Sequence, residues 1–106
     1  MAEVLTIEEL RGRIDMIDDQ LVRLLNVRVA CAVEVGRLKH EAGMPIYQPD
    51  REAQVLGAVR QSATELAGPL TAEAVVRIFE RIIDEARRAE REASSRRQGS
   101  DSSIGE

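Results

Sequence analysis

The chain has 106 residues, 43% of them apolar, so it is the size of one small domain whose core, built from a single copy, would bury only a modest share of its surface. Its net charge of −4 argues against nucleic acid as a partner, because phosphate backbones attract net basic surfaces. No run of 18 apolar residues occurs, and the first ten residues lack the basic and apolar segments of a signal peptide, so we expect a cytoplasmic protein with no membrane span.

The first predicted element is one long helix. Thr6 is followed three positions later by Glu9, the capping-box pattern that starts a helix. Apolar residues then recur at spacings of four and three, without a proline, as far as Gly43-Met44-Pro45. The pattern predicts a helix of about 35 residues, roughly 50 Å long. Because this exceeds the diameter of so small a globule, we expect its apolar stripe to pack on a second copy of the chain.

Two further helices and a tail are predicted downstream. Pro49 suits the first turn of a helix that continues to about Glu65. Thr71 can cap a third helix that runs to about Ala93. Residues 94–106 are rich in serine, glycine and charge, so we expect a disordered tail behind a domain of residues 1–93. The predicted fold class is all-α, with three helices per subunit.

The single cysteine, Cys31, cannot form an internal disulfide, and no histidine or second cysteine stands at metal-ligand spacing from it. It lies within the apolar pattern of the first helix, so we expect it to be a buried small hydrophobic residue. We expect no metal.

Charged residues on the apolar stripes are the candidate site, since a purely structural helix would carry leucine or isoleucine there. Arg28 lies at the stripe spacing between Leu24 and Cys31. Lys39 follows 11 positions later, roughly 20° around the helix and about 16 Å along it, so both side chains could hold one dianion. The alternative is that Arg28 pairs with an acid across a dimer interface and Lys39 reaches solvent.

Arg11 precedes Arg28 by 17 positions, roughly 25 Å along the axis and about 100° around it. One chain cannot bring both to one small molecule, so a contribution from Arg11 would have to come from the partner's first helix. The alternative for Arg11 is an exposed charge near the N-terminus.

The second and third helices add further candidates. Arg51 and Glu52 open the apolar face of the second helix, with Gln48 just before it, and a solvated first turn is the alternative. Glu90 continues the apolar stripe of the third helix, and its alternative is a helix end that emerges into water beside an arginine-rich run.

Taken together, these residues resemble the all-helical class of chorismate mutases over about Ile7 to Glu90. The matching stretches are Arg11-x-x-Ile14-Asp15-x-x-Asp18, Leu24-Leu25-x-x-Arg28, Ala32-Val33-Glu34-Val35-Gly36-Arg37-x-Lys39 and Pro45-Ile46-Tyr47-x-Pro49-x-Arg51-Glu52. The resemblance implies an intertwined homodimer that rearranges chorismate, a dianion, to prephenate in aromatic amino-acid biosynthesis, without cofactor or metal.

The resemblance also implies roles for the candidate residues. Arg11 of one subunit and Arg28 of the other would hold the two carboxylates of chorismate. Lys39 would contact a carboxylate and the ether oxygen, with Glu90 on the other side of that oxygen.

The remaining candidates would line the pocket. The segment that carries Gln48, together with Arg51 and Glu52, would bind the ring hydroxyl. The sequence departs from the family pattern in three places: Gln48 stands where an acidic residue is often found, Ala86 where some members carry serine, and Glu90 where many carry glutamine.

Other functions stay open on the sequence alone. The same fold could serve an isochorismate pyruvate-lyase or a mutase for 4-amino-4-deoxychorismate, since Glu52 could accept a hydrogen bond from a hydroxyl or an ammonium group. A different class would be a non-catalytic dimeric helical adaptor or a regulatory subunit of a shikimate-pathway enzyme. The adaptor hypothesis leaves the charges on the apolar stripes unexplained. No nucleophile or metal is needed for an intramolecular [3,3] rearrangement.

Overall fold

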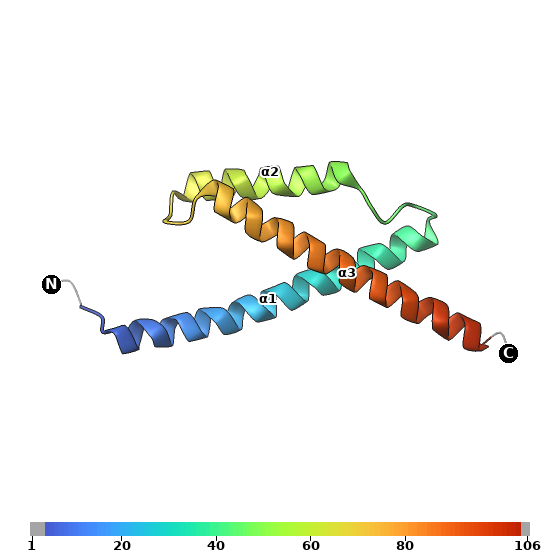
Figure 1. Ribbon diagram of the computed structural model, residues 1–106, viewed down its shortest axis with the longest axis horizontal. Coiled ribbons are helices and arrows are strands. Elements are labelled where there is room, and N and C mark those ends of the chain that lie inside the picture. The colour runs from blue at the N-terminus through green and yellow to red at the C-terminus, as the bar shows by residue number, and fades with distance from the viewer. Residues whose placement is uncertain (1–3, 105–106) are drawn as a thin grey trace.

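The computed structural model describes residues 4–104, and in that part of the chain it consists of three helices without strands (Figure 1). They are α1 (Ile7–Glu41), α2 (Pro49–Leu66) and α3 (Ala72–Ile104). The predicted all-α class and the starts of the three helices are confirmed. None of these helices is both long and apolar enough to cross a membrane.

Threonine caps set the starts of α1 and α3. The Thr6 hydroxyl oxygen accepts a hydrogen bond from the Glu9 backbone N–H at 3.1 Å, and the Glu9 carboxylate accepts one from the Thr6 N–H at 2.9 Å. The Thr71 hydroxyl oxygen accepts from the Ala74 N–H at 3.1 Å. These bonds satisfy backbone donors that a helix start leaves unpaired, which is why the sequence pattern located both starts.

A glycine ends α1 just beyond Lys39. Gly43 has a φ of 69°, in the left-handed region that glycine adopts without strain. Its N–H donates to the His40 carbonyl, and the Met44 N–H donates to the Lys39 carbonyl at 2.8 Å. This pair of bonds is a Schellman motif, which fixes the direction in which the chain leaves the helix.

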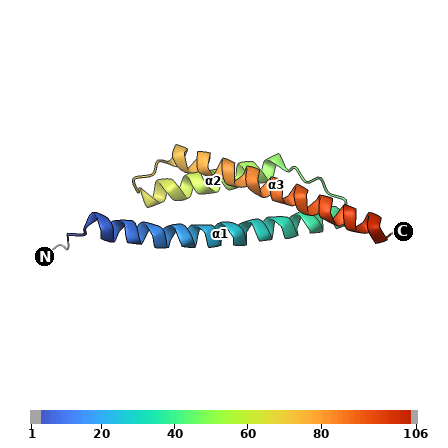
Figure 2. The ribbon, with the colours of Figure 1, turned by 60° about the horizontal axis from the view of Figure 1, so that its bottom comes forward.

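Helix α3 joins the other two, and α1 crosses it obliquely (Figures 1 and 2). In the described part of the chain, the backbones of α1 and α2 do not approach each other closely. Small residues occupy the crossing of α1 and α3: Gly36 and Ala86 are buried, and so is Ala93 about two turns further along α3. A Cβ atom on Gly36 would lie 3.4 Å from Cγ of Glu90, so the Glu90 side chain packs closely against α1 at this glycine.

Helix α3 is longer than predicted. We expected residues 94–104 to be disordered, but in the structure they continue α3 to Ile104. Ala93 is 9% exposed, and the next turns of α3 form a shallow hollow with α1, in which Ser94, Arg97 and Gln98 lie near Arg37. The polar composition indicated too little burial for order, but at residues 94–98 packing against α1 supplies contacts that composition does not reveal. Residues 105 and 106 lie outside the described part, and a domain boundary at residue 93 stays a prediction.

The subunit is extended rather than compact. Its radius of gyration is 18.9 Å, whereas a compact domain of this length has about 13 Å. The N-terminal half of α1 projects away from α2 and α3 (Figure 1). Its stripe residues are open to solvent in the single chain, with Leu10 44%, Ile14 54% and Leu21 50% exposed. Cys31 is also exposed, which corrects the prediction that it is buried. The first helix therefore carries an apolar surface that its own subunit does not cover.

A substitution at the end of α2 should increase the stability of the protein. Ala67 has a φ of 53°, and its N–H donates to the Ala63 carbonyl at 3.1 Å. A residue with a Cβ atom is strained there and glycine is not, so Ala67→Gly should raise the free energy of unfolding by about 1 kcal/mol. Chemical denaturation at fixed protein concentration measures this. The matched control is Ala58→Gly in the middle of α2, which should lower that free energy by about 1 kcal/mol. Equal effects of both changes would contradict the argument.

Candidate active site

A pocket of about 300 Å³ lies where the three helices meet the connection between α1 and α2. Its charged lining residues are Arg28, Lys39, Arg51, Glu52, Arg87 and Glu90. Its apolar lining comes mainly from Val35, Ile46, Val55 and Ile83. The pocket thus brings together six of the seven residues predicted for the site: Arg28, Lys39, Gln48, Arg51, Glu52 and Glu90.

Arg11 is the predicted residue that the subunit does not bring to the pocket. It is exposed and lies in the projecting half of α1. Figure 2 shows α1 as a nearly straight helix, so the 17 positions between Arg11 and Arg28 correspond to about 25 Å. Within one subunit Arg11 and Arg28 cannot contact the same small molecule.

Lys39 is held at the edge of the pocket by the connection that follows α1. Its Nζ donates a hydrogen bond to the Ile46 carbonyl at 3.2 Å, and its side chain is half-buried. The Schellman motif that contains the Lys39 carbonyl turns the chain back so that Ile46 can make this bond. An ammonium group has three N–H donors, so two remain for a ligand.

Arg28 is half-buried and lies over an aromatic ring. Its guanidinium carbon is 6.0 Å from the centroid of Phe79 on α3, a cation–π contact that orients the side chain. In the part of the chain that the structure describes, no carboxylate forms an ion pair with it. Its N–H donors are therefore available to a carboxylate on a ligand.

Glu90 is half-buried beneath α1. Burial raises the pKa of Glu90, and the charges of Lys39, Arg87 and Arg91 oppose this rise without cancelling it. The close approach to Gly36 explains the burial, since Oε2 of Glu90 lies 3.5 Å from where a Cβ atom on that glycine would be. A raised pKa favours the protonated carboxyl, which can donate a hydrogen bond as well as accept one.

Gln48 and Arg51 lie at the start of α2. Gln48 is the N-cap residue, but its side chain makes no capping hydrogen bond and instead lines the pocket. Arg51 is exposed, and its Nη1 donates to Oε1 of Gln54 at 2.9 Å. Both side chains are therefore at the rim of the pocket, where a solvated first turn and a ligand contact are compatible.

Arg87 is a pocket residue that the sequence analysis did not select. Its guanidinium pairs with the carboxylate of Glu52 on α2, and its central carbon lies 5.2 Å from the centroid of Tyr47. Arg87 follows Ile83 by four positions and precedes Glu90 by three, which is the spacing of the stripe. This spacing could have identified Arg87 as a pocket residue, but Arg87 lies in a run of several arginines that resembles a solvent-exposed helix surface.

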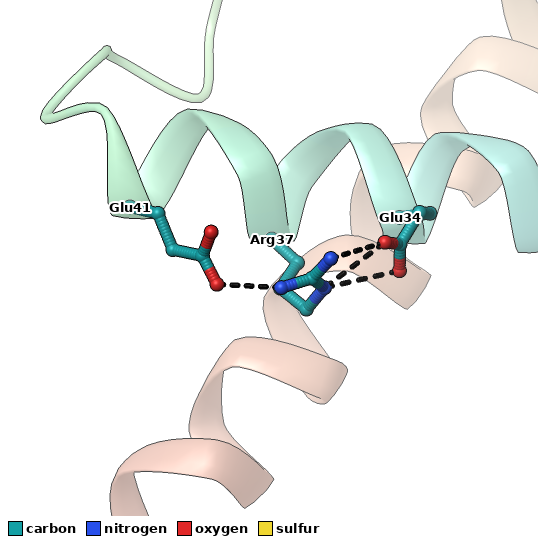
Figure 3. Close-up of polar contacts among 3 residues, drawn as sticks. All are labelled: Glu34, Arg37 and Glu41. Carbon is teal, nitrogen blue, oxygen red and sulfur yellow. Dashed lines mark hydrogen bonds and ion pairs between the residues drawn. The ribbon is translucent and has the colours of Figure 1, made fainter.

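A second charged cluster lies on α1 outside the pocket. Figure 3 shows the Arg37 guanidinium between the carboxylates of Glu34 and Glu41, with ion-pair distances of 2.5 Å to each. The hydrogen bond from Arg37 lowers the pKa of Glu34, and the pair with Glu34 raises the pKa of Arg37. These exposed contacts three and four residues apart support the helix and leave Arg37 no role in the pocket.

The arrangement suits a small anion with apolar parts. Four cationic side chains, Arg28, Lys39, Arg51 and Arg87, reach the pocket from three helices, and aliphatic residues form its walls. Cys31 lines the pocket, but no histidine of the described residues does. Among residues 4–98, whose side chains the structure describes, no group of three or more His, Cys, Asp or Glu is arranged to hold a metal ion. The available chemistry is binding, orientation and electrostatic stabilisation.

Comparison with known proteins gives one consistent result. Residues 10–91 match the family model "Chorismate mutase type II". The chain is 37% identical over 78 residues to a bifunctional chorismate mutase/prephenate dehydratase of Aquifex aeolicus, a match that covers 73% of this chain and 22% of that protein. It is 36% identical over 80 residues to a T-protein of Haemophilus influenzae, with 76% and 21% covered. The chain thus spans about a fifth of the length of these relatives.

A solved structure is similar over almost its whole length. The chorismate mutase from Thermus thermophilus superposes with a TM-score of 0.69 and 32% sequence identity. The match covers 76% of this chain and 96% of that one.

Proposed function

Because the chain belongs to the chorismate mutase type II family, we propose that it catalyses the rearrangement of chorismate to prephenate in aromatic amino-acid biosynthesis. The observation that carries the proposal is the convergence of Arg28 and Lys39 from α1, Glu52 from α2 and Glu90 from α3 on one pocket. An adaptor or regulatory subunit would have no need of such a pocket. An exposed free cysteine suits a reducing compartment, so we also propose that the protein acts in the cytoplasm.

The reaction is an intramolecular rearrangement, in which one carbon–oxygen bond breaks while one carbon–carbon bond forms. No proton transfer and no covalent intermediate are required. Arg28 and a second cation would hold the two carboxylates of the substrate in the compact conformation that reacts. Lys39, already oriented by the Ile46 carbonyl, would donate a hydrogen bond to the oxygen on which negative charge develops.

Glu90 would lie on the other side of that oxygen. As a carboxylate it would repel the developing charge, whereas a protonated carboxyl would donate a second hydrogen bond. Its burial under Gly36 supports the protonated form. The proposed mechanism therefore needs Glu90 neutral.

We propose that the active form is an intertwined homodimer. The accessible surface of the single chain is 8560 Å², roughly 2,700 Å² more than a compact monomer of this mass exposes. For two copies the excess is about 5,400 Å², which is at the upper end of the total area that permanent dimers bury. Exposed leucine and isoleucine residues along α1 supply an apolar interface. In such a dimer Arg11 of the partner subunit would reach the pocket and supply the second cation.

The direct test is an assay of the purified protein with chorismate, isochorismate and 4-amino-4-deoxychorismate separately, with identification of the products. We expect prephenate from chorismate.

Lys39→Ala should lower turnover by about 10² to 10³, the usual loss for one preorganised donor, with little change in melting temperature. The control His40→Ala alters the exposed neighbour outside the pocket and should keep most activity. Near-normal turnover, or unfolding, of Lys39→Ala would assign the lysine a structural role.

Mixed dimers test the contribution of Arg11. Arg11→Ala and Arg28→Ala chains should each be inactive, because each lacks one carboxylate ligand in both sites. Co-expressed with different tags and purified as heterodimers, they should recover activity, since one of the two sites then has both arginines. Heterodimers that form but stay inactive would place both arginines on the same subunit's site, contrary to the proposal.

The pH profile tests the protonation state of Glu90. Because burial raises its pKa, the protonated form persists to higher pH than for an ordinary glutamate, and turnover should fall as pH rises through that pKa. Glu90→Gln donates at any pH and should flatten this fall. The control Glu92→Gln, at an exposed position two residues away, should keep the parent profile. Superimposable curves for Glu90→Gln and the parent would remove Glu90 from the site.

A further inference from the structure

Arg87 has no role in the proposed mechanism. Its ion pair with Glu52 is nevertheless the least solvent-exposed ion pair of the described residues. The side chains of Arg87 and Glu52 are 28% and 27% exposed, and in every other pair at least one partner is more open. Tyr47 lies over the guanidinium, and Asp84 Oδ1 is 3.6 Å from Nη1. The pair with Glu52 and the ring of Tyr47 therefore hold Arg87 in place while it faces the pocket, and the longer, exposed contact with Asp84 contributes little.

The hydroxyl group on the ring of the proposed substrate needs an acceptor. The pocket side chains that can accept are Gln48, Glu52 and Glu90, and the backbone carbonyl of Ile46 already accepts from Lys39. Burial raises the pKa of Glu90, which favours its donor form. Glu52 beside Arg87 is a carboxylate with about four acceptor positions, of which Arg87 occupies one. Glu52 is the strongest acceptor left for a hydroxyl.

Resting on the proposed function, we propose that Arg87 determines substrate specificity: by pairing with Glu52 it makes the pocket prefer a neutral hydroxyl to an ammonium group at the same ring position. A lone carboxylate would attract an ammonium more strongly than a hydroxyl. With Arg87 in place, the charge of Glu52 is already balanced, and a ligand ammonium would also meet a like charge nearby. A hydroxyl needs only a free lone pair. Arg87 acts through Glu52 and is thus a positioning residue.

The experiment compares kcat/KM for chorismate with kcat/KM for 4-amino-4-deoxychorismate, using the full chain as the parent and as Arg87→Met and Arg87→Lys. The parent should prefer chorismate. In Arg87→Met the ratio of the two constants should fall by at least about tenfold, since like-charge juxtaposition in a shielded site is worth more than this factor. Arg87→Lys keeps the positive charge and should stay near the parent ratio. Asp84→Asn removes an acid that is 61% exposed beside Arg87 and should leave the ratio unchanged.

A purely structural role predicts a different result. If Arg87 only ties α3 to α2, its loss should lower both constants together and leave their ratio unchanged. Circular dichroism checks that each variant folds, and Arg87→Gln, which keeps a hydrogen bond to Glu52 without the charge, carries the same expectation as Arg87→Met.

The outcomes separate the two proposals. A parent that converts chorismate, with one ratio for all variants, overturns the role of Arg87 alone. A parent that prefers the amine, or that converts neither compound, overturns the proposed function and this inference with it.

Discussion

The close crossing of α1 over α3 is the contact on which the rest of the structure depends. Gly36 and Ala86 are buried there, and neither has a side chain large enough to separate the helices. The absence of a side chain at Gly36 lets the Glu90 side chain pack directly against α1, where it loses water and its pKa rises. The crossing also sets Lys39, one turn further along α1, at the mouth of the same pocket. A larger residue at position 36 would displace the Glu90 side chain, so the packing of α1 on α3 also fixes the position of a pocket residue.

The same crossing leaves half of α1 without a partner in its own subunit. The N-terminal half of α1, a helix of 35 residues, projects away from α2 and α3 and exposes a long apolar stripe. The length of α1 therefore explains both observations: its apolar stripe is exposed, and Arg11 lies too far along the helix to reach the pocket of its own subunit. A second copy that covered the stripe would bring its own Arg11 toward the pocket, so the proposed interface and the proposed site would form together. In the proposed dimer, this linkage would allow so small a chain to support an active site.

Sequence reasoning succeeded where local chemistry decides the structure. The capping pattern of Thr6 and Glu9 located the start of α1 because both partners lie within one helical turn. The stripe positions of Arg28 and Lys39 indicated a pocket because helix periodicity is also local. Burial depends on which element packs where, and that is not a local property. Cys31 was predicted to be buried for want of this information, and the order of residues 94–104 was missed for the same reason.

The two acidic residues of the pocket, Glu52 and Glu90, have different electrostatic surroundings. Arg28, Lys39, Arg51 and Arg87 carry four positive charges, and a dianionic ligand would compete for them with Glu52 and Glu90. Glu52 is satisfied by Arg87, whose second acidic neighbour, Asp84, is more exposed and lies at 3.6 Å. Glu90 has no such ion pair among the described residues, and its burial favours the uncharged form over the attraction of the surrounding cations. The surroundings of the two carboxyl groups thus act in opposite directions: the ion pair with Arg87 stabilises the charged form of Glu52, and burial raises the pKa of Glu90. Arg28, Lys39 and Arg51 are left with their charges available, so the pocket keeps the excess positive charge that a dianion requires.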